Sequence, residues 1–125
     1  MLGVLIIKYS RWIAMMDTSN GIAALVKAHE KYAGGAAQTL YLDDDLYIMQ
    51  RTGYTDKPGL IYVLNNRGEA WHGAWVNTQW KNVSFEPVAW WGKADRSRPI
   101  DQATGSDGQG QFFAPARGYA VYAPK

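Results

Sequence analysis

The apolar pattern of the chain changes its period at Gly34-Gly35, and this change constrains the fold more than any other feature. Before it, residues 20–33 (NGIAALVKAHEKYA) place apolar and aromatic side chains at three- and four-residue steps, which is typical of an amphipathic helix. Asn20 is of a type that caps helices, and a glycine pair is a common C-terminal stop. After the glycines, short runs of alternating apolar residues predict strands. The sequence therefore predicts one helix followed by β structure.

The remaining segments predict strands separated by turns. QTLYL and LYIMQR flank the acidic turn 43–45 and predict a hairpin, and GLIYVLNN ends in a turn at 65–68. AWHGAWV, VSFEPVAWW and the terminal GQFFAPARGYAVYAPK supply further strands, whereas the polar segment 94–110 predicts a loop. The predicted fold is mainly β: an antiparallel Greek-key β-sandwich of about seven or eight strands preceded by one α-helix.

Size and charge narrow the function classes. The 125 residues suit a single domain, and the chain has no cysteine, which excludes disulfides and thiol catalysis. The net charge is +2, and Lys and Arg are scattered rather than gathered in a basic stripe, so we expect no nucleic-acid partner. The N-terminal segment fits neither a signal peptide nor a membrane-spanning helix, so we expect no membrane association.

Six separated blocks of the chain resemble the end of bacterial liquefying-type α-amylases. The blocks are LVKAHEKYAGG, DLYIMQR, GLIYVLNNRG, W-x-G-x-WV-x-T-x-W, PVAWWGK and FFAPARGYAVYAP, and they cover about residues 20–125. In that family the helix ending in YAGG is the last helix of the catalytic (β/α)8 barrel, and a C-terminal β-sandwich, domain C, follows it. The resemblance implies three parts: an atypical leader 1–19, a barrel-type helix 20–35 and a β-sandwich domain 36–125.

The resemblance also implies that the chain is not catalytic by itself. Family members carry an Asp, Glu, Asp set in the barrel, and residues 1–19 do not resemble barrel sequence, so that set carries over to no position here. The implied role is a non-catalytic, extracellular domain that binds starch-like α-glucan. Without a barrel, the helix stripe needs another partner, so we expect the leader VLIIKY to cover it or the chain to form homo-oligomers through residues 1–33. The stripe consists of Ile22, Leu25, Val26 and Tyr32.

Two alternatives remain beside glucan binding. Glycoside hydrolysis usually needs two carboxylates between ~5 and ~9.5 Å apart. The carboxylates of this chain are scattered through turns, and Glu69 and Glu86 are the candidates for a small glycoside hydrolase with its own pair. The other alternative is a purely structural domain that supported a lost catalytic barrel.

The resemblance further implies a candidate calcium site. In the family, the first hairpin turn and the turn after the next strand supply ligands at the seam between barrel and sandwich, and Asp44, Asp45 and Asn66 occupy those positions here. Calcium takes six to eight oxygen ligands, and the barrel's share is missing. We therefore expect an ordinary acidic turn and no bound metal or other cofactor.

Tryptophan is concentrated in one part of the chain, because five of the six fall between Trp71 and Trp91. Aromatic rings beside polar groups hold sugars, but the same rings also fill cores. Neighbouring side chains on a strand point to opposite faces, so Trp90 and Trp91 cannot both point inward. We expect Trp71 and one of this pair in the core. The predicted carbohydrate-binding residues are Trp75, Trp80, Trp90, Trp91, Asn77 and Gln79.

Overall fold

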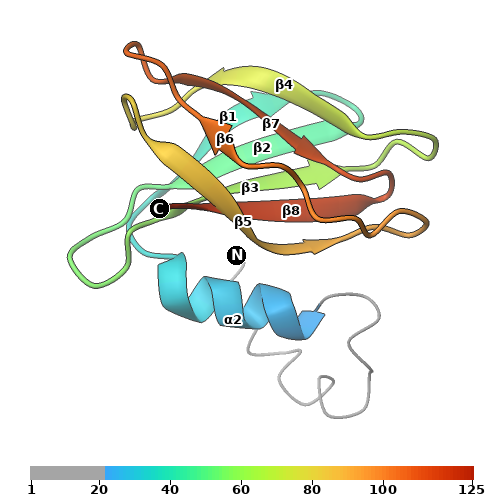
Figure 1. Ribbon diagram of the computed structural model, residues 1–125, viewed down its shortest axis with the longest axis horizontal. Coiled ribbons are helices and arrows are strands. Elements are labelled where there is room, and N and C mark those ends of the chain that lie inside the picture. Colours follow the sequence, from blue (N-terminus) through green and yellow to red (C-terminus); the bar gives the residue numbers. More distant parts are fainter. Residues whose placement is uncertain (1–21) are drawn as a thin grey trace.

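The structure, a computed structural model, describes residues 22–125 (Figure 1). Within these residues, one helix, α2 (Ile22–Tyr32), precedes eight strands, which confirms the predicted fold class. The expectations for the leader 1–19 and for a cap at Asn20 lie outside the described residues. Within residues 22–125, no helix combines the length and the apolar character needed to cross a membrane.

The strands fall close to the segments that the sequence predicts. The predicted loop 94–110 also contains a two-residue strand, because that part of the loop pairs with the edge of the large sheet. The strands are β1 (Ala37–Leu42), β2 (Leu46–Arg51), β3 (Leu60–Asn65), β4 (His72–Asn77), β5 (Ser84–Trp91), β6 (Gln102–Ala103), β7 (Gln109–Ala114) and β8 (Gly118–Pro124).

The strands form two antiparallel sheets. The larger sheet has the order β1-β2-β3-β8-β5-β6, and the smaller consists of β4 and β7. The last strand of the chain, β8, is inserted between β3 and β5, so the order in space departs from the order in sequence. Figure 1 shows β4 and β7 as a second layer over the large sheet, with α2 on its other side beside β5 and β8.

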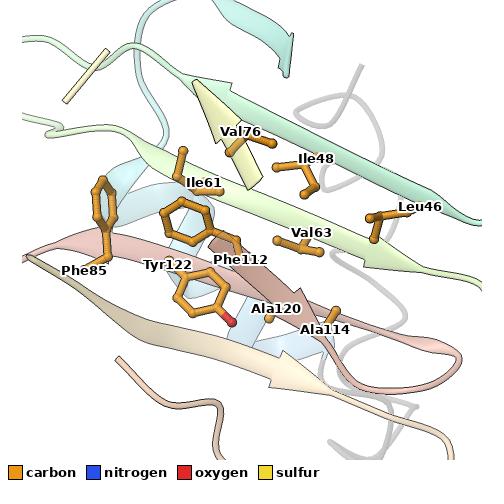
Figure 2. Packing of buried hydrophobic residues seen from close by; sticks show 10 residues of the cluster. All are labelled: Leu46, Ile48, Ile61, Val63, Val76, Phe85, Phe112, Ala114, Ala120 and Tyr122. Atoms are coloured by element: carbon orange, nitrogen blue, oxygen red, sulfur yellow. The ribbon is translucent and has the colours of Figure 1, made fainter. Parts of the chain in front are cut away.

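The main core lies between the two sheets (Figure 2). Four aromatic rings follow one another through it in edge-to-face contacts, with centroid distances of 5.3, 5.4 and 5.2 Å. This arrangement is favoured over face-to-face stacking by the ring quadrupoles. In order, the rings belong to Trp80, Phe85, Phe112 and Tyr122.

A second apolar cluster joins α2 to the outer face of the large sheet. Ala28 is 3% exposed, and Leu25 and Tyr32 pack on the same cluster, which contains Ala89 and Val121 of the sheet. Leu25 and Tyr32 thus have a partner that we did not expect, the outer face of the large sheet. Oligomer formation through residues 1–33 stays a prediction.

Candidate functional site

The outer face of the small sheet carries the most exposed tryptophan among the described residues. On β4, Val76 points into the core, and its neighbour Trp75 therefore points outward, with 63% of its surface exposed. Directly opposite residues of an antiparallel pair share a face, so the β4–β7 register adds the partners of Trp75 and of its alternate neighbours. We call this surface the Trp75 face; it consists of Gly73, Trp75, Asn77, Gln109, Gln111 and Phe113.

Phe113 depends on the glycine opposite it. A Cβ added to Gly73 would lie 2.5 Å from Cδ1 of Phe113 and 2.2 Å from the carbonyl oxygen of Phe112. The Phe113 ring therefore lies directly against the bare backbone of β4. Trp75 is the diagonal neighbour of Phe113 across the two strands, a relationship that separates residues by about 7–8 Å and their Cβ atoms by somewhat less. Two aromatic rings thus occupy adjacent places on the Trp75 face.

A hollow of about 230 Å³ opens next to Phe113, at the edge of the sandwich. Its lining includes Ile100, 73% exposed, and Pro99 from the loop after β5, together with Trp71 from just before β4. We call it the Ile100 hollow; its lining residues are Trp71, Arg98, Pro99, Ile100, Gln102, Phe113 and Tyr122.

The expectation that Trp71 is a core residue is wrong. Trp71 precedes the first residue of β4, is only half-buried and belongs to neither buried cluster. Its Nε1 donates a hydrogen bond of 2.8 Å to Oδ2 of Asp95 in the loop after β5. Because an indole N–H needs an acceptor, the ring lies at the sandwich edge, where a carboxylate can meet it.

The loop after β5 is fixed by several polar contacts. Ser97 donates to Oδ1 of Asp95 through its hydroxyl at 2.6 Å and its backbone N–H at 2.9 Å. These hydrogen bonds, together with that from Trp71, lower the pKa of Asp95 to about 2. The backbone oxygen of Arg96 accepts a hydrogen bond of 3.0 Å from Trp90 Nε1, and its guanidinium lies 5.1 Å from the centre of the Trp91 ring. The loop that forms one wall of the Ile100 hollow is therefore anchored on three tryptophans.

Trp90 and Trp91 point to opposite sides of the large sheet, as predicted. Trp90 packs on the core between the sheets, whereas Trp91 packs on the cluster beneath α2. A bulge between Pro87 and Ala89 shifts the alternation by one residue and so makes Trp90 the inward member. Both rings are half-buried, and neither lies on the Trp75 face.

The remaining predicted binding residues separate into two groups. Asn77 is exposed on the Trp75 face, next to Trp75 along the strand direction. Trp80 is half-buried against Phe85, at 5.3 Å between ring centroids. The side-chain amide of Gln79 donates to the carbonyl oxygen of Thr52 at 2.8 Å, so one of its donors is already used. The structure brings Trp75 and Asn77 together and places Trp80 and Gln79 off that face.

Sequence reasoning did not identify Gln109, Gln111 and Phe113. Their alternation in the segment GQGQFFA is visible in the sequence and predicts that they share a face. Their place beside Trp75 depends on the register between β4 and β7, which are separated by the whole of β5 and β6. No local pattern in the sequence predicts which residues of β4 and β7 pair.

The two candidate catalytic carboxylates lie toward opposite ends of β8. Glu69 belongs to the turn that follows Asn65, which pairs with Gly118 at the start of β8. Glu86 pairs with Ala123 near its end. Five residues of strand span about 17 Å, well beyond the separation of ~5 to ~9.5 Å that glycosidases use. The structure therefore does not assemble Glu69 and Glu86 into a hydrolytic pair.

The acidic turn is held by its own hydrogen bonds. Oδ1 of Asp43 accepts the backbone N–H groups of Asp45 and Leu46, each at 2.8 Å, and Oδ2 accepts the Tyr41 hydroxyl at 2.8 Å. The hydrogen bond from the Asp45 N–H is the main cause that lowers the pKa of Asp43, followed by that from Tyr41. The carboxylate of Asp43 thus closes the hairpin.

The candidate calcium ligands meet in one hollow but do not complete a site. Asp44, Asp45 and Asn66 line a hollow of about 280 Å³, and the Asn66 N–H donates to the Asp45 carbonyl oxygen at 2.8 Å. The Asp45 carboxylate also lies 3.6 Å from the guanidinium of Arg67. Within residues 22–125, no three His, Cys, Asp or Glu side chains are grouped so that they could hold a metal ion. These residues alone do not fit a cation that needs six to eight oxygens.

Comparison with known proteins identifies a family whose model matches this chain. The family model described as "Alpha-amylase C-terminal" matches residues 60–123. A comparison with curated protein sequences finds no match. One similar solved structure is a GH30 endoxylanase from Clostridium papyrosolvens C71, with a TM-score of 0.57, 13% identity, and coverage of 84% of this chain and 28% of that chain.

A second similar structure is the glycoside hydrolase family 30 subfamily 8 xylanase Xyn30A from Clostridium acetobutylicum, with a TM-score of 0.54 and 15% identity. The match covers 84% of this chain and 28% of that chain, so the chain spans less than a third of the length of either xylanase. At these identities the likeness concerns the fold. The family match covers just over half of the chain and includes β3 to β8, apart from the last residue of β8. The chain belongs to the α-amylase C-terminal domain family.

Proposed function

We propose that this domain binds starch-like α-glucan, without catalysis, through the Trp75 face. The observation that carries the proposal is the 63% exposure of Trp75 on a strand whose alternate residues fill the core. A pyranose ring presents a flat, weakly polar C–H surface that an exposed indole can cover. The neighbouring Phe113 extends the aromatic surface along the sheet.

The polar side chains around Trp75 suit a neutral sugar. Asn77, Gln109 and Gln111 each carry an amide that both donates and accepts hydrogen bonds, as sugar hydroxyls do. The Trp75 face contains no charged side chain. This composition supports a neutral glycan over an acidic polysaccharide.

Membership of the α-amylase C-terminal family supports α-glucan as the polymer. A single stacking site binds weakly, and a domain of this kind gains from repeated contacts along a polymer. Joined to a catalytic domain, it would hold the polymer near the active site. The proposal also places the protein outside the cell, where undissolved polysaccharide is found.

Affinity electrophoresis in gels that contain starch, glycogen, cellulose or xylan tests the proposal. We expect starch and glycogen to retard the unaltered protein and Trp75→Ala to migrate as in a gel without polysaccharide. Tyr54→Ala is the matched control, because Tyr54 is an aromatic residue with 56% exposure on the β2–β3 loop, away from the Trp75 face. Unchanged mobility with starch and glycogen would overturn the proposal and favour a purely structural domain. Retardation by cellulose or xylan alone would show that the glycan class is wrong.

A further inference from the structure

The Ile100 hollow adjoins the Trp75 face at Phe113, which belongs to both. One side of this residue adjoins Gly73 on the sheet, and the residue also lines the hollow together with Trp71 and Ile100. A ligand lying across Trp75 can therefore extend past Phe113 into the hollow without leaving an aromatic surface.

The hollow has the chemistry of a small sugar site. Its walls are mostly apolar, from Trp71, Pro99, Ile100 and Phe113. Gln102 adds a side-chain amide that makes no hydrogen bond within residues 22–125. Sites of this kind combine apolar walls with a few polar groups that fix orientation.

The one charged residue that lines the hollow, Arg98, is already held by an ion pair. Arg98 donates to Oδ1 of Asp101 at 3.0 Å and to the carbonyl oxygen of Pro99 at 3.3 Å. Lys125 approaches the other carboxylate oxygen of Asp101 at 2.7 Å. The other residues that line the hollow are uncharged, which suits a neutral ring.

The outer wall of the hollow is fixed before any ligand arrives. The loop that carries it is held by the Trp71–Asp95 hydrogen bond and by the Trp90–Arg96 hydrogen bond. The Arg98–Asp101 ion pair holds its far end. A preformed site loses less conformational freedom on binding than a mobile one.

We propose that the Ile100 hollow is a second sugar subsite, which takes a further pyranose ring of the same α-glucan chain that lies on Trp75. At about 230 Å³ the hollow is smaller than the roughly 300–1,000 Å³ of sites for drug-sized ligands, so it suits a single ring. The domain thus recognises an oligosaccharide segment rather than one ring. This inference rests on the proposed function of the Trp75 face.

Isothermal titration calorimetry with maltose, maltotriose, maltopentaose and maltoheptaose tests the inference. We expect the affinity of the unaltered protein to rise with chain length. Ile100→Ser should lower the affinity for maltoheptaose by roughly five- to tenfold, the effect of losing one aliphatic contact, and should lower that for maltose less. Leu42→Ser is the matched control, because Leu42 is 71% exposed at the far hairpin, against 73% for Ile100.

The outcomes separate the two proposals. Affinity that does not depend on chain length but is lost in Trp75→Ala would overturn the second subsite and keep the first. Equal effects of Ile100→Ser and Leu42→Ser would also overturn it. If the unaltered protein binds none of the oligosaccharides and no starch, both proposals are wrong.

Discussion

The indole Nε1 of Trp71 donates a 2.8 Å hydrogen bond to Oδ2 of Asp95 and so joins the residue before β4 to the loop after β5. β4 belongs to the small sheet and β5 to the large one, so this contact links the two layers outside their shared core. The loop that it holds carries Ile100, and the ring that donates lines the same hollow. The candidate binding surface therefore depends on a polar contact at the edge of the sandwich.

The Trp71–Asp95 contact should survive in moderately acidic solution. Hydrogen bonds from Ser97 and Trp71 lower the pKa of Asp95 from 3.8 to about 2. The pKa of Asp95 is lower in the folded than in the unfolded state. The contact therefore stabilises the fold fully above about pH 4, and this stabilisation disappears as the pH falls through about 2. We expect the indole N–H resonance of Trp71 to titrate with a midpoint near pH 2.

Two further measurements serve as controls for the titration of the Trp71 resonance. Trp75 makes no indole hydrogen bond within residues 22–125, so its N–H resonance should not shift in the same range. In Asp95→Asn the Trp71 transition should disappear, because the side chain no longer titrates. A Trp71 midpoint at the ordinary carboxyl value of 3.8 would contradict the prediction.

Substitution of Trp75 should affect glucan binding, whereas substitution of Trp80 should affect the stability of the fold. Trp75 is 63% exposed, so Trp75→Ala should change the free energy of unfolding by no more than about 0.5 kcal/mol while removing glucan binding. Trp80 packs edge-to-face on Phe85, so Trp80→Ala should cost about 2–4 kcal/mol. Urea unfolding followed by circular dichroism measures both. Equal destabilisation by the two substitutions would show that Trp75 is a packing residue as well.

Gly73→Ala should disturb the Trp75 face by displacing the Phe113 ring. The new Cβ would meet the Phe113 ring at 2.5 Å and the Phe112 carbonyl oxygen at 2.2 Å, so we expect a loss of about 1–3 kcal/mol of stability. Displacement of Phe113 should also weaken binding of maltoheptaose. Gly105→Ala is the control, because its Cβ would come no closer than 3.2 Å to the end of the Asp107 side chain. Equal unfolding midpoints for the two variants would contradict the close approach of Phe113.

The packing of α2 can be tested on two alanines of the same helix. Ala28 is 3% exposed in the cluster beneath the helix, whereas Ala24 is exposed to solvent. Ala28→Asp should strongly lower the thermal unfolding temperature, because it buries an unpaired carboxylate. Ala24→Asp introduces the same side chain into the helix without the burial. Similar unfolding temperatures would show that the helix does not pack on the large sheet in solution.

The elements of this fold follow from local patterns, but their arrangement does not. The change of period at Gly34-Gly35 and the turn after each apolar run predict the helix and most strands within a few residues. The insertion of β8 between β3 and β5 brings together segments far apart in sequence, and no local pattern contains that pairing.

The candidate site shows the same division. Trp75 and Asn77 are among the predicted binding residues, and the structure places both on the outside of the small sheet. The position of Phe113 beside Trp75 follows only from the β4–β7 register, which depends on tertiary packing. Alternation does not determine the direction of the Trp71 ring, because this residue precedes the first residue of β4, and the prediction that it lies in the core is therefore wrong.

The adjacent tryptophans of β5 offer a direct measurement of one hydrogen bond. Trp90 Nε1 donates to the backbone oxygen of Arg96 at 3.0 Å, whereas Trp91 Nε1 is a buried nitrogen without a hydrogen-bond partner within residues 22–125. Trp90→Phe and Trp91→Phe remove similar ring volumes from half-buried positions. Trp90→Phe should therefore destabilise the fold by about 0.5–1.5 kcal/mol more, the net contribution of a hydrogen bond. A phenylalanine at position 91 would still present a ring to the Arg96 guanidinium. Urea unfolding of both variants measures the difference, and a larger loss in Trp91→Phe would show that its indole N–H has an acceptor in solution.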